Sequence, residues 1–102
     1  MARRRLEEGE IQQALVGLPA WRRREGCLVR DFRCADFADA FACMGRIAET
    51  ADRLDHHPDW CQSWNRVEVS LTTHSAGGLT PLDLDLARAI DRIVEEAGCV
   101  SS

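Results

Sequence analysis

The chain has no lysine and no tyrosine, and each of its thirteen Lys-plus-Arg positions is an arginine. Without lysine it cannot form a Schiff base or present the lysine of a phosphate-binding P-loop. Without tyrosine it has no phenolic acid. It contains only three histidines, so histidine-based proton transfer near neutral pH can involve very few groups.

Long apolar runs, internal repeats and low-complexity segments are also missing, and no stretch approaches the length that spans a membrane. Apolar residues make up 45% and charged residues 29% of the chain, as in an ordinary soluble globular protein. The 102 residues correspond to one domain, residues 1–102. The net charge of −4 argues against nucleic-acid binding, which needs a basic face. We therefore expect a soluble domain with neither a nucleic-acid nor a membrane partner.

The cysteines follow no metal or redox spacing. There are five, an odd number, and no pair is arranged as C-x-x-C. The charged beginning, from Met1 to Leu6, lacks the apolar segment of a secretory signal. We interpret all five as reduced residues of a cytoplasmic protein: Cys27, Cys34, Cys43, Cys61 and Cys99.

Apolar periodicity predicts three helices. A short one covers about residues 6–15, and Gly17-Leu18-Pro19 ends it. The longest covers about residues 35–55 and ends before Pro58. Its apolar stripe, for the core or a subunit interface, is Phe37, Phe41, Met44, Ala48 and Ala51, with Ile47 and Leu54 beside it. The last begins at Thr80-Pro81, carries Leu82, Leu86, Ile90 and Ile93, and is closed by Gly98.

Four strands are expected between these helices. Residues 21–25 and 27–33 form a hairpin around Glu25-Gly26. Residues 65–73 alternate, with Val67, Val69 and Leu71 on one face, and 59–64 form a shorter strand ahead of them. The order α-β-β-α-β-β-α predicts an α+β domain, with three helices packed on one face of a four-stranded antiparallel sheet.

The histidines fall at the ends of predicted elements. His56 and His57 follow the long helix, and His74 follows the alternating strand, so the three could meet at one edge of the sheet. Histidine suits acid–base catalysis because its unperturbed pKa is about 6.5. Simpler interpretations also exist: the pair could complement a helix dipole, His74 could be a turn residue, and Asp83 could be only a capping partner. Trp60 and Trp64 could be core residues or wall a pocket for a flat ring.

Zinc is the other chemistry that three histidines suggest. The side chains of adjacent histidines diverge, so one metal ion seldom binds both. We place metal binding below acid–base catalysis and expect no metal and no cofactor.

The spacing of these residues resembles the signature of the pterin-4a-carbinolamine dehydratases. Five residues separate Pro58 from Trp64, nine separate Trp64 from His74, and eight separate His74 from Asp83. The similarity extends from about Leu6 to Ala97 and includes Asp52, four residues before His56. The one departure is Trp64, where the family more often has tyrosine. It keeps the ring but loses a hydroxyl.

The resemblance implies dehydration of a 4a-hydroxytetrahydropterin to a quinonoid dihydropterin without a cofactor. It assigns catalysis to His56, His57, His74 and Asp83. His56 and His74 would transfer protons, His57 would bind substrate or be the other proton-transfer group, and Asp83 would orient His74. Substrate would be held by Asp55, His56, His57, Thr72, Thr73, His74 and Ser75.

The same resemblance implies partners. It indicates a pterin substrate, homodimers that pair into homotetramers, and a functional link to an aromatic amino acid hydroxylase through tetrahydrobiopterin recycling. Family members are also known as dimerisation cofactors, so a non-catalytic assembly role is the alternative. The three histidines and Asp83 favour an enzyme, because a pure binding protein has no need of them.

Overall fold

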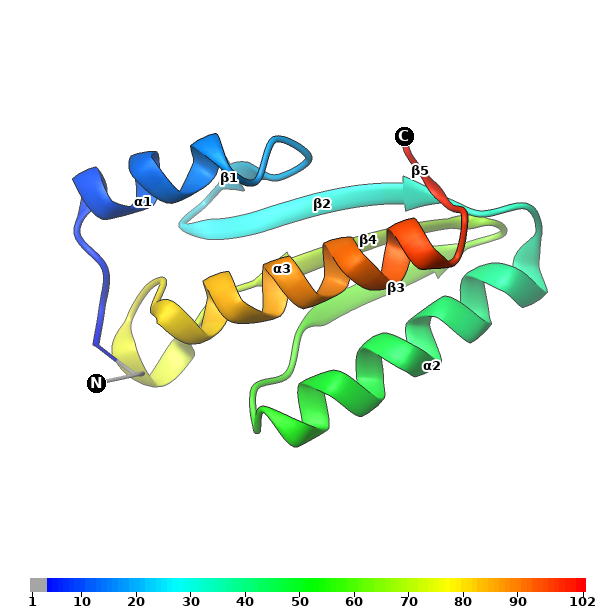
Figure 1. Cartoon of the computed structure of the whole chain (residues 1–102). Coiled ribbons are helices and arrows are strands. Elements are labelled where there is room, and N and C mark those ends of the chain that lie inside the picture. Colours follow the sequence, from blue (N-terminus) through cyan, green and yellow to red (C-terminus); the bar gives the residue numbers. More distant parts are fainter. Residues whose placement is uncertain (1–3) are drawn as a thin grey trace.

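A computed structural model describes residues 4–102 (Figure 1). Residues 1–3 lie outside it, and with them half of the charged beginning from Met1 to Leu6. In chain order the elements are α1 (Glu8–Val16), β1 (Arg22–Arg24), β2 (Cys27–Arg33), α2 (Phe37–Arg53), β3 (Asp59–Ser63), β4 (Arg66–Leu71), the short 3-10 helix η1 (His74–Ala76), α3 (Pro81–Glu96) and β5 (Val100–Ser101).

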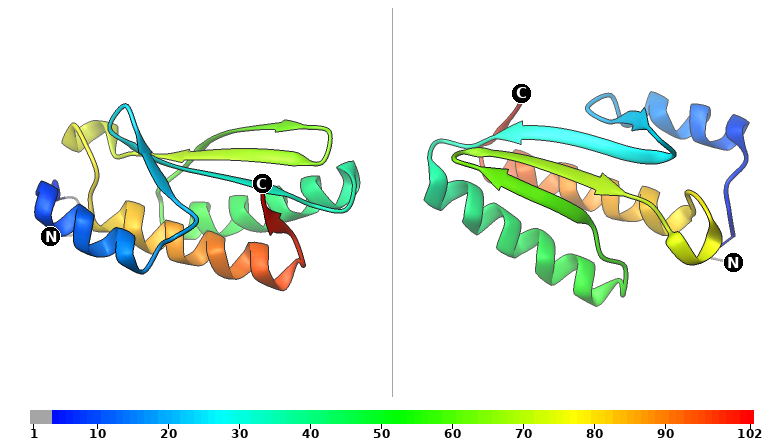
Figure 2. Two further views of the ribbon diagram at one scale, coloured as in Figure 1. Left: turned by 90° about the horizontal axis from the view of Figure 1, so that it is seen from above. Right: turned by 180° about the vertical axis from the view of Figure 1, so that it is seen from behind.

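The strands form one antiparallel sheet in the order β1-β2-β4-β3, and β5 pairs with the end of β2. The three helices lie on one side of this sheet (Figure 2, left). This arrangement confirms the predicted α+β fold. The sequence does not predict β5, because two exposed residues carry no periodic signal.

Alternation along the strands sends apolar side chains to the helix side. Val67, Val69 and Leu71 of β4 are buried there, as are Leu28 and Phe32 of β2. From the helices they meet Ile47 of α2 and Leu86 and Ile90 of α3, all fully buried.

The buried face of α2 differs from the predicted stripe. Its buried residues are Ala40, Cys43, Ile47 and Ala51. Phe37 and Phe41 are instead exposed, and Phe37 contacts both Phe41 and Trp64, with ring centroids 6.4 and 6.3 Å apart. Apolar character alone does not distinguish the core face of a helix from an exposed apolar face beside it.

Arg30 interrupts the apolar side of β2, and its charge is compensated inside the fold. Its guanidinium pairs with Asp91 of α3, and its Nη2 donates to Ser101 Oγ at 3.2 Å. Asp91 also accepts a hydrogen bond of 2.7 Å from the Trp21 indole N–H. The carboxylate makes burial of the arginine tolerable, because an unpaired buried charge is strongly unfavourable.

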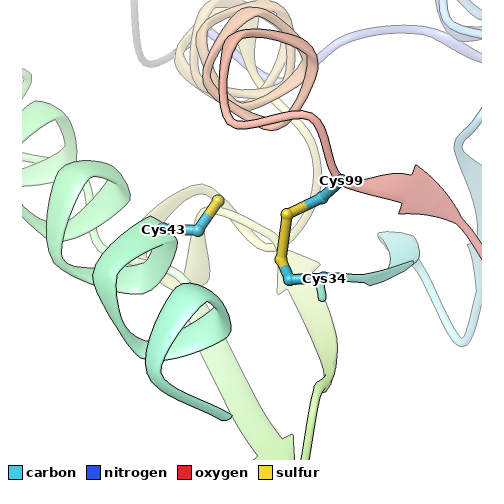
Figure 3. Close-up of side chains that lie close together, drawn as sticks. All are labelled: Cys34, Cys43 and Cys99. Atoms are coloured by element: carbon cyan, nitrogen blue, oxygen red, sulfur yellow. A yellow bond between two sulfur atoms is a disulfide. The ribbon is translucent and has the colours of Figure 1, made fainter. Parts of the chain in front are cut away.

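One interpretation of the cysteines is wrong: Cys34 and Cys99 form a disulfide (Figure 3). The two are 65 positions apart. The return of the chain after α3, where β5 pairs with β2, brings them together. No local sequence spacing predicts a disulfide between cysteines this far apart. The remaining cysteines are free: Cys27, Cys43 and Cys61.

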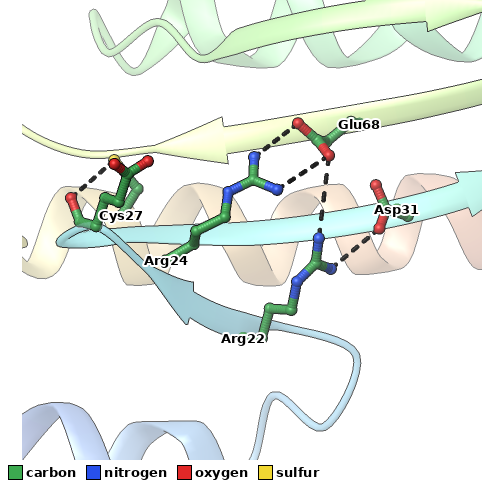
Figure 4. A network of polar contacts seen from close by, with 6 residues as sticks. Arg22, Arg24, Cys27, Asp31 and Glu68 are labelled. Carbon is green, nitrogen blue, oxygen red and sulfur yellow. Dashed lines mark hydrogen bonds and ion pairs between the residues drawn. The ribbon is translucent and has the colours of Figure 1, made fainter.

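An ion-pair network covers the sheet face opposite the helices (Figure 4). Arg24 binds Glu68 at 2.8 Å, and Arg22 binds Asp31 at 3.0 Å. Arg24 is the main cause of a lowered pKa of Glu68. The basic run of residues 22–24 is therefore paired surface charge. Within residues 4–102, no helix combines the length and apolar character needed to cross a bilayer.

Candidate active site

The predicted site residues gather at one end of the sheet. His56 and His57 follow α2, η1 begins at His74 just beyond β4, and Asp83 lies in the first turn of α3. β3 and β4 pair Asp59 with Ser70, so the start of β3 and the exit of β4 are neighbours. This end carries η1 and the last turn of α2 in Figure 1. The elements that carry these residues therefore end at the same end of the sheet.

The best-defined contact of the site joins His56 to Asp83. His56 Nε2 lies 2.5 Å from Asp83 Oδ1. The histidine is 7% exposed and the aspartate is fully buried. A charged or strongly polar pair this deep in the protein must be held by further hydrogen bonds to be tolerated.

Those further bonds come from two threonines. Asp83 Oδ2 accepts from the Thr73 hydroxyl at 2.8 Å and from the Thr80 backbone N–H at 2.9 Å. The Thr73 and Thr80 hydroxyl oxygens are 2.8 Å apart. Thr80 is the N-cap of α3 and Asp83 completes its capping box, so helix initiation and carboxylate placement share the same atoms. Both carboxylate oxygens are therefore fixed.

The charge state of Asp83 decides which tautomer of His56 this contact selects. An ionised carboxylate can only accept hydrogen bonds. With an ionised Asp83, the proton of this contact lies on His56 Nε2, and Nδ1 is the second ring nitrogen. Orientation of an imidazole by a buried carboxylate is a recurring device of acid–base catalysts.

The other two histidines are at the surface. His57 Nε2 lies 3.4 Å from Asp52 Oδ1, and its side chain is 62% exposed. His74 Nε2 lies 3.8 Å from Asp59 Oδ2, and its side chain is 85% exposed. The His74–Asp59 contact links η1 to the start of β3, two residues after His57. Solvated groups of this kind can contact a ligand directly.

The structure changes the predicted role of Asp83. We expected it to orient His74, but the Asp83 carboxylate contacts His56, Thr73 and Thr80, and His74 lies beside Asp59 instead. The expectation that Asp83 belongs to a capping box is confirmed. The two roles coincide because the first turn of α3 faces the end of α2.

The residues expected to hold substrate differ in accessibility. Thr73 is buried at 2% exposure with its hydroxyl bound to Asp83, so its side chain supports the site from inside. Thr72 is half-buried and Ser75 is exposed. Asp55 is exposed and has a left-handed backbone with φ of 52°, where the chain turns from α2 toward His56.

Trp64 lies away from the histidines, at the turn between β3 and β4 and at the opposite end of those strands. It is 67% exposed and contacts Phe37. The sequence analysis also missed two contributors, Thr80 and Asp59. A capping signal marked Thr80, and Asp59 follows His57 by two residues, but the sequence does not show that Thr80 packs beside Asp83 or that Asp59 meets His74.

The distances between possible metal-ligating atoms test whether the histidines could form a zinc site. Among residues 4–102, no set of three ligating atoms within 4.8 Å of one another includes a histidine.

Comparisons with known proteins identify the family of this chain. The family described as "Pterin 4 alpha carbinolamine dehydratase" matches residues 4–93. Proteins of Brucella ovis and Brucella canis, both provisionally named pterin-4-alpha-carbinolamine dehydratase, are each 44% identical over 95 residues, covering 91% of this chain and 98% of theirs. A Brucella melitensis crystal structure described as a transcriptional coactivator/pterin dehydratase has a TM-score of 0.84 and 42% identity, covering 87% of this chain and 97% of that one. The chain belongs to the pterin-4-alpha-carbinolamine dehydratase family.

Proposed function

We propose that this chain dehydrates a 4a-hydroxytetrahydropterin, such as the 4a-hydroxytetrahydrobiopterin formed when an aromatic amino acid hydroxylase acts, and so returns the pterin for reuse. The observation that carries the proposal is the buried His56–Asp83 pair, with contacts to both oxygens of the carboxylate. Family membership supports the same chemistry.

The reaction needs one proton delivered and one removed. The 4a-hydroxyl leaves as water once it is protonated, and N5 loses its proton as the C4a=N5 double bond forms. One histidine would give its proton to the leaving hydroxyl, and the other would take the proton from N5. Proton exchange with solvent would then return both histidines to their starting states. A positioned acid or base typically contributes ~10²–10⁴ in rate.

His56 is the positioned member of this pair in our proposal. Asp83 holds its Nε2–H, and Nδ1 exchanges a proton with the substrate. The negative carboxylate compensates the positive charge of the imidazolium form. His74 is the second proton-transfer group, and its exposure leaves it open to a ligand. His57 binds the pterin ring or takes the place of His74 in proton transfer.

Polar groups around the histidines would hold the edges of the pterin ring. Asp55, Thr72 and Ser75 are partly or fully exposed at this end of the sheet. Thr73 acts indirectly, through its hydrogen bond to Asp83. No step in this account requires a metal ion or a covalent intermediate.

The test is the dehydration rate of a chemically prepared 4a-hydroxypterin with purified protein. We expect His56→Ala and His74→Ala each to lower the rate at least about tenfold, on the order of one acid–base group. A chelator should leave the wild-type rate unchanged. Full activity in both variants while they stay folded would disprove the mechanism, and loss of activity on chelation would favour a metal enzyme.

One observation favours a second role in assembly. Phe37, Phe41 and Trp64 form an exposed aromatic patch on α2 and the β3–β4 turn. We propose that this patch contributes to homo-oligomerisation. Light scattering at several concentrations should show a smaller assembly for Phe41→Ser than for wild type. An equal mass for both proteins would show that the patch is not part of the subunit interface. A wild-type protein without dehydratase activity, but with a stable heterologous partner, would favour the non-catalytic assembly role.

A further inference from the structure

Three sulfur atoms lie together away from the candidate active site (Figure 3). The sulfurs of Cys34, Cys43 and Cys99 are all within 4.8 Å of one another. Cys34 and Cys43 are buried and Cys99 is half-buried. Cys99 follows the C-terminal end of α3, whereas Asp83 lies at its N-terminal end. The length of α3 from Asp83 to Glu96 separates the two places by about 20 Å.

We propose that, once the Cys34–Cys99 disulfide is reduced, these three cysteines form a three-coordinate thiolate site for a soft monovalent cation, Cu(I). This inference is independent of the proposed dehydratase activity. It uses none of the histidines or Asp83.

The donor set selects the cation. Thiolates favour Cu(I) and Zn(II) among the common metal ions. Structural zinc takes four ligands in a tetrahedron, and among residues 4–102 the group contains three. Metal–sulfur bonds of about 2.3 Å place three sulfurs in a plane about 4 Å apart. Cys43 Sγ already lies within 4.8 Å of the other two sulfurs, whereas Cys34 and Cys99 Sγ, bonded to each other in the disulfide, must move apart to this spacing after reduction.

Backbone contacts keep the cysteines in place without the disulfide. The Cys34 N–H donates to the Asn65 carbonyl, and the Asn65 side chain donates to the Cys34 carbonyl, both at 2.9 Å. The Cys99 N–H donates to the Val94 carbonyl at 3.1 Å. Cys43 lies within α2 and is 1% exposed. Reduction therefore frees two ligands whose backbones remain positioned by other bonds.

The chemistry balances with a dithiol as the reductant. The disulfide takes up two electrons and two protons and becomes two thiols, while the dithiol becomes a cyclic disulfide. Cu(I) then forms three Cu–S bonds and displaces up to three thiol protons to solvent. In the oxidised protein two of the three sulfurs are bonded to each other, so the site is closed to metal.

The experiment titrates the full chain with Cu(I) under nitrogen. The protein is reduced with a dithiol, freed of it by gel filtration, and titrated against a coloured Cu(I) chelator. We expect one Cu(I) per reduced chain and none at this site in the oxidised chain. Zn(II) should bind more weakly than Cu(I).

Matched variants separate the cluster from other thiols. Loss of a contact that supports a metal ligand typically lowers metal affinity about 10–100-fold, and loss of the ligand itself should lower it at least as much. We therefore expect Cys43→Ala to weaken Cu(I) binding roughly 100-fold or more. Cys61→Ala removes an exposed thiol outside the cluster and should bind as wild type does. If Cys43→Ala fails to fold by circular dichroism, Cys99→Ala takes its place. Equal affinity in wild type and the folded cluster variant, or loss of binding in Cys61→Ala, would overturn the proposal.

Discussion

At the scale of single residues, Asp83 connects the start of α3 to His56. It caps the helix through Thr80 and holds the imidazole through its other oxygen. Thr73 and the Thr80 backbone N–H donate to one of its oxygens, and an ionised carboxylate can accept from the imidazole at the other. A role in stability and a role in positioning therefore coincide in one side chain.

Replacing Asp83 by asparagine should affect both roles. The amide NH₂ would face a donor, leaving a buried polar group without a partner, which costs about 1–3 kcal/mol of unfolding free energy. We expect kcat for pterin dehydration to fall about tenfold or more, with KM less affected. Urea denaturation and steady-state kinetics measure the two effects.

Asp85→Asn is the control for this change. Asp85 is exposed on the same helix and contacts Arg88 at 3.4 Å. Its replacement should change the unfolding free energy by less than about 0.5 kcal/mol and leave kcat intact. Equal effects of the two variants would contradict the role assigned to Asp83.

At the scale of elements, the pattern of the sequence predicted most of the fold. The apolar alternation in β4 and the Thr80-Pro81 start of α3 depend on residues that are neighbours in the sequence. Both can therefore be predicted without knowledge of tertiary contacts. The exposure of Phe37 and Phe41 on α2 could not be predicted, because both side chains are as apolar as core residues. The pairing of Asp83 with His56 could not be predicted either, because it depends on how the ends of α2 and α3 meet.

The ion pairs between β1 and β4 predict a pH effect. Arg24 lowers the pKa of Glu68 in the folded protein, so the stability from this pair is present above the ordinary glutamate pKa of 4.5. It is lost as the pH falls through the lowered value. Because both side chains are substantially exposed, the contribution should be below about 1 kcal/mol.

Arg24→Gln measures this effect. Urea denaturation should show the variant less stable than wild type at pH 7, with the difference shrinking in strong acid. Arg88→Gln, which alters an exposed pair on α3, is the control for simple loss of an arginine. A difference that grows on acidification would contradict the assignment.

At the scale of the whole molecule, the Cys34–Cys99 disulfide closes a loop of 65 positions that contains α2, β3, β4 and α3. Such a cross-link restricts the unfolded chain. Loops of this length correspond to about 4 kcal/mol in the chain-entropy description, and measured effects are often smaller.

We therefore expect reduction to lower the free energy of unfolding by about 2–4 kcal/mol. The backbone contacts of Cys34 and Cys99 should keep the fold itself unchanged. Denaturation with and without a dithiol measures the difference, and Cys61→Ala should respond as wild type does. An unchanged midpoint in the reduced protein would show that the cross-link adds no stability.

The most direct test of the account is the dehydration rate of His56→Gln. A glutamine amide nitrogen can replace Nε2 as the donor to Asp83, but the side chain has no nitrogen that exchanges a proton near neutral pH. We predict a folded protein whose rate on a 4a-hydroxypterin is about 100-fold or more below wild type, within the range for one acid–base group. A folded His56→Gln protein with the wild-type rate would contradict the assignment of proton transfer to His56.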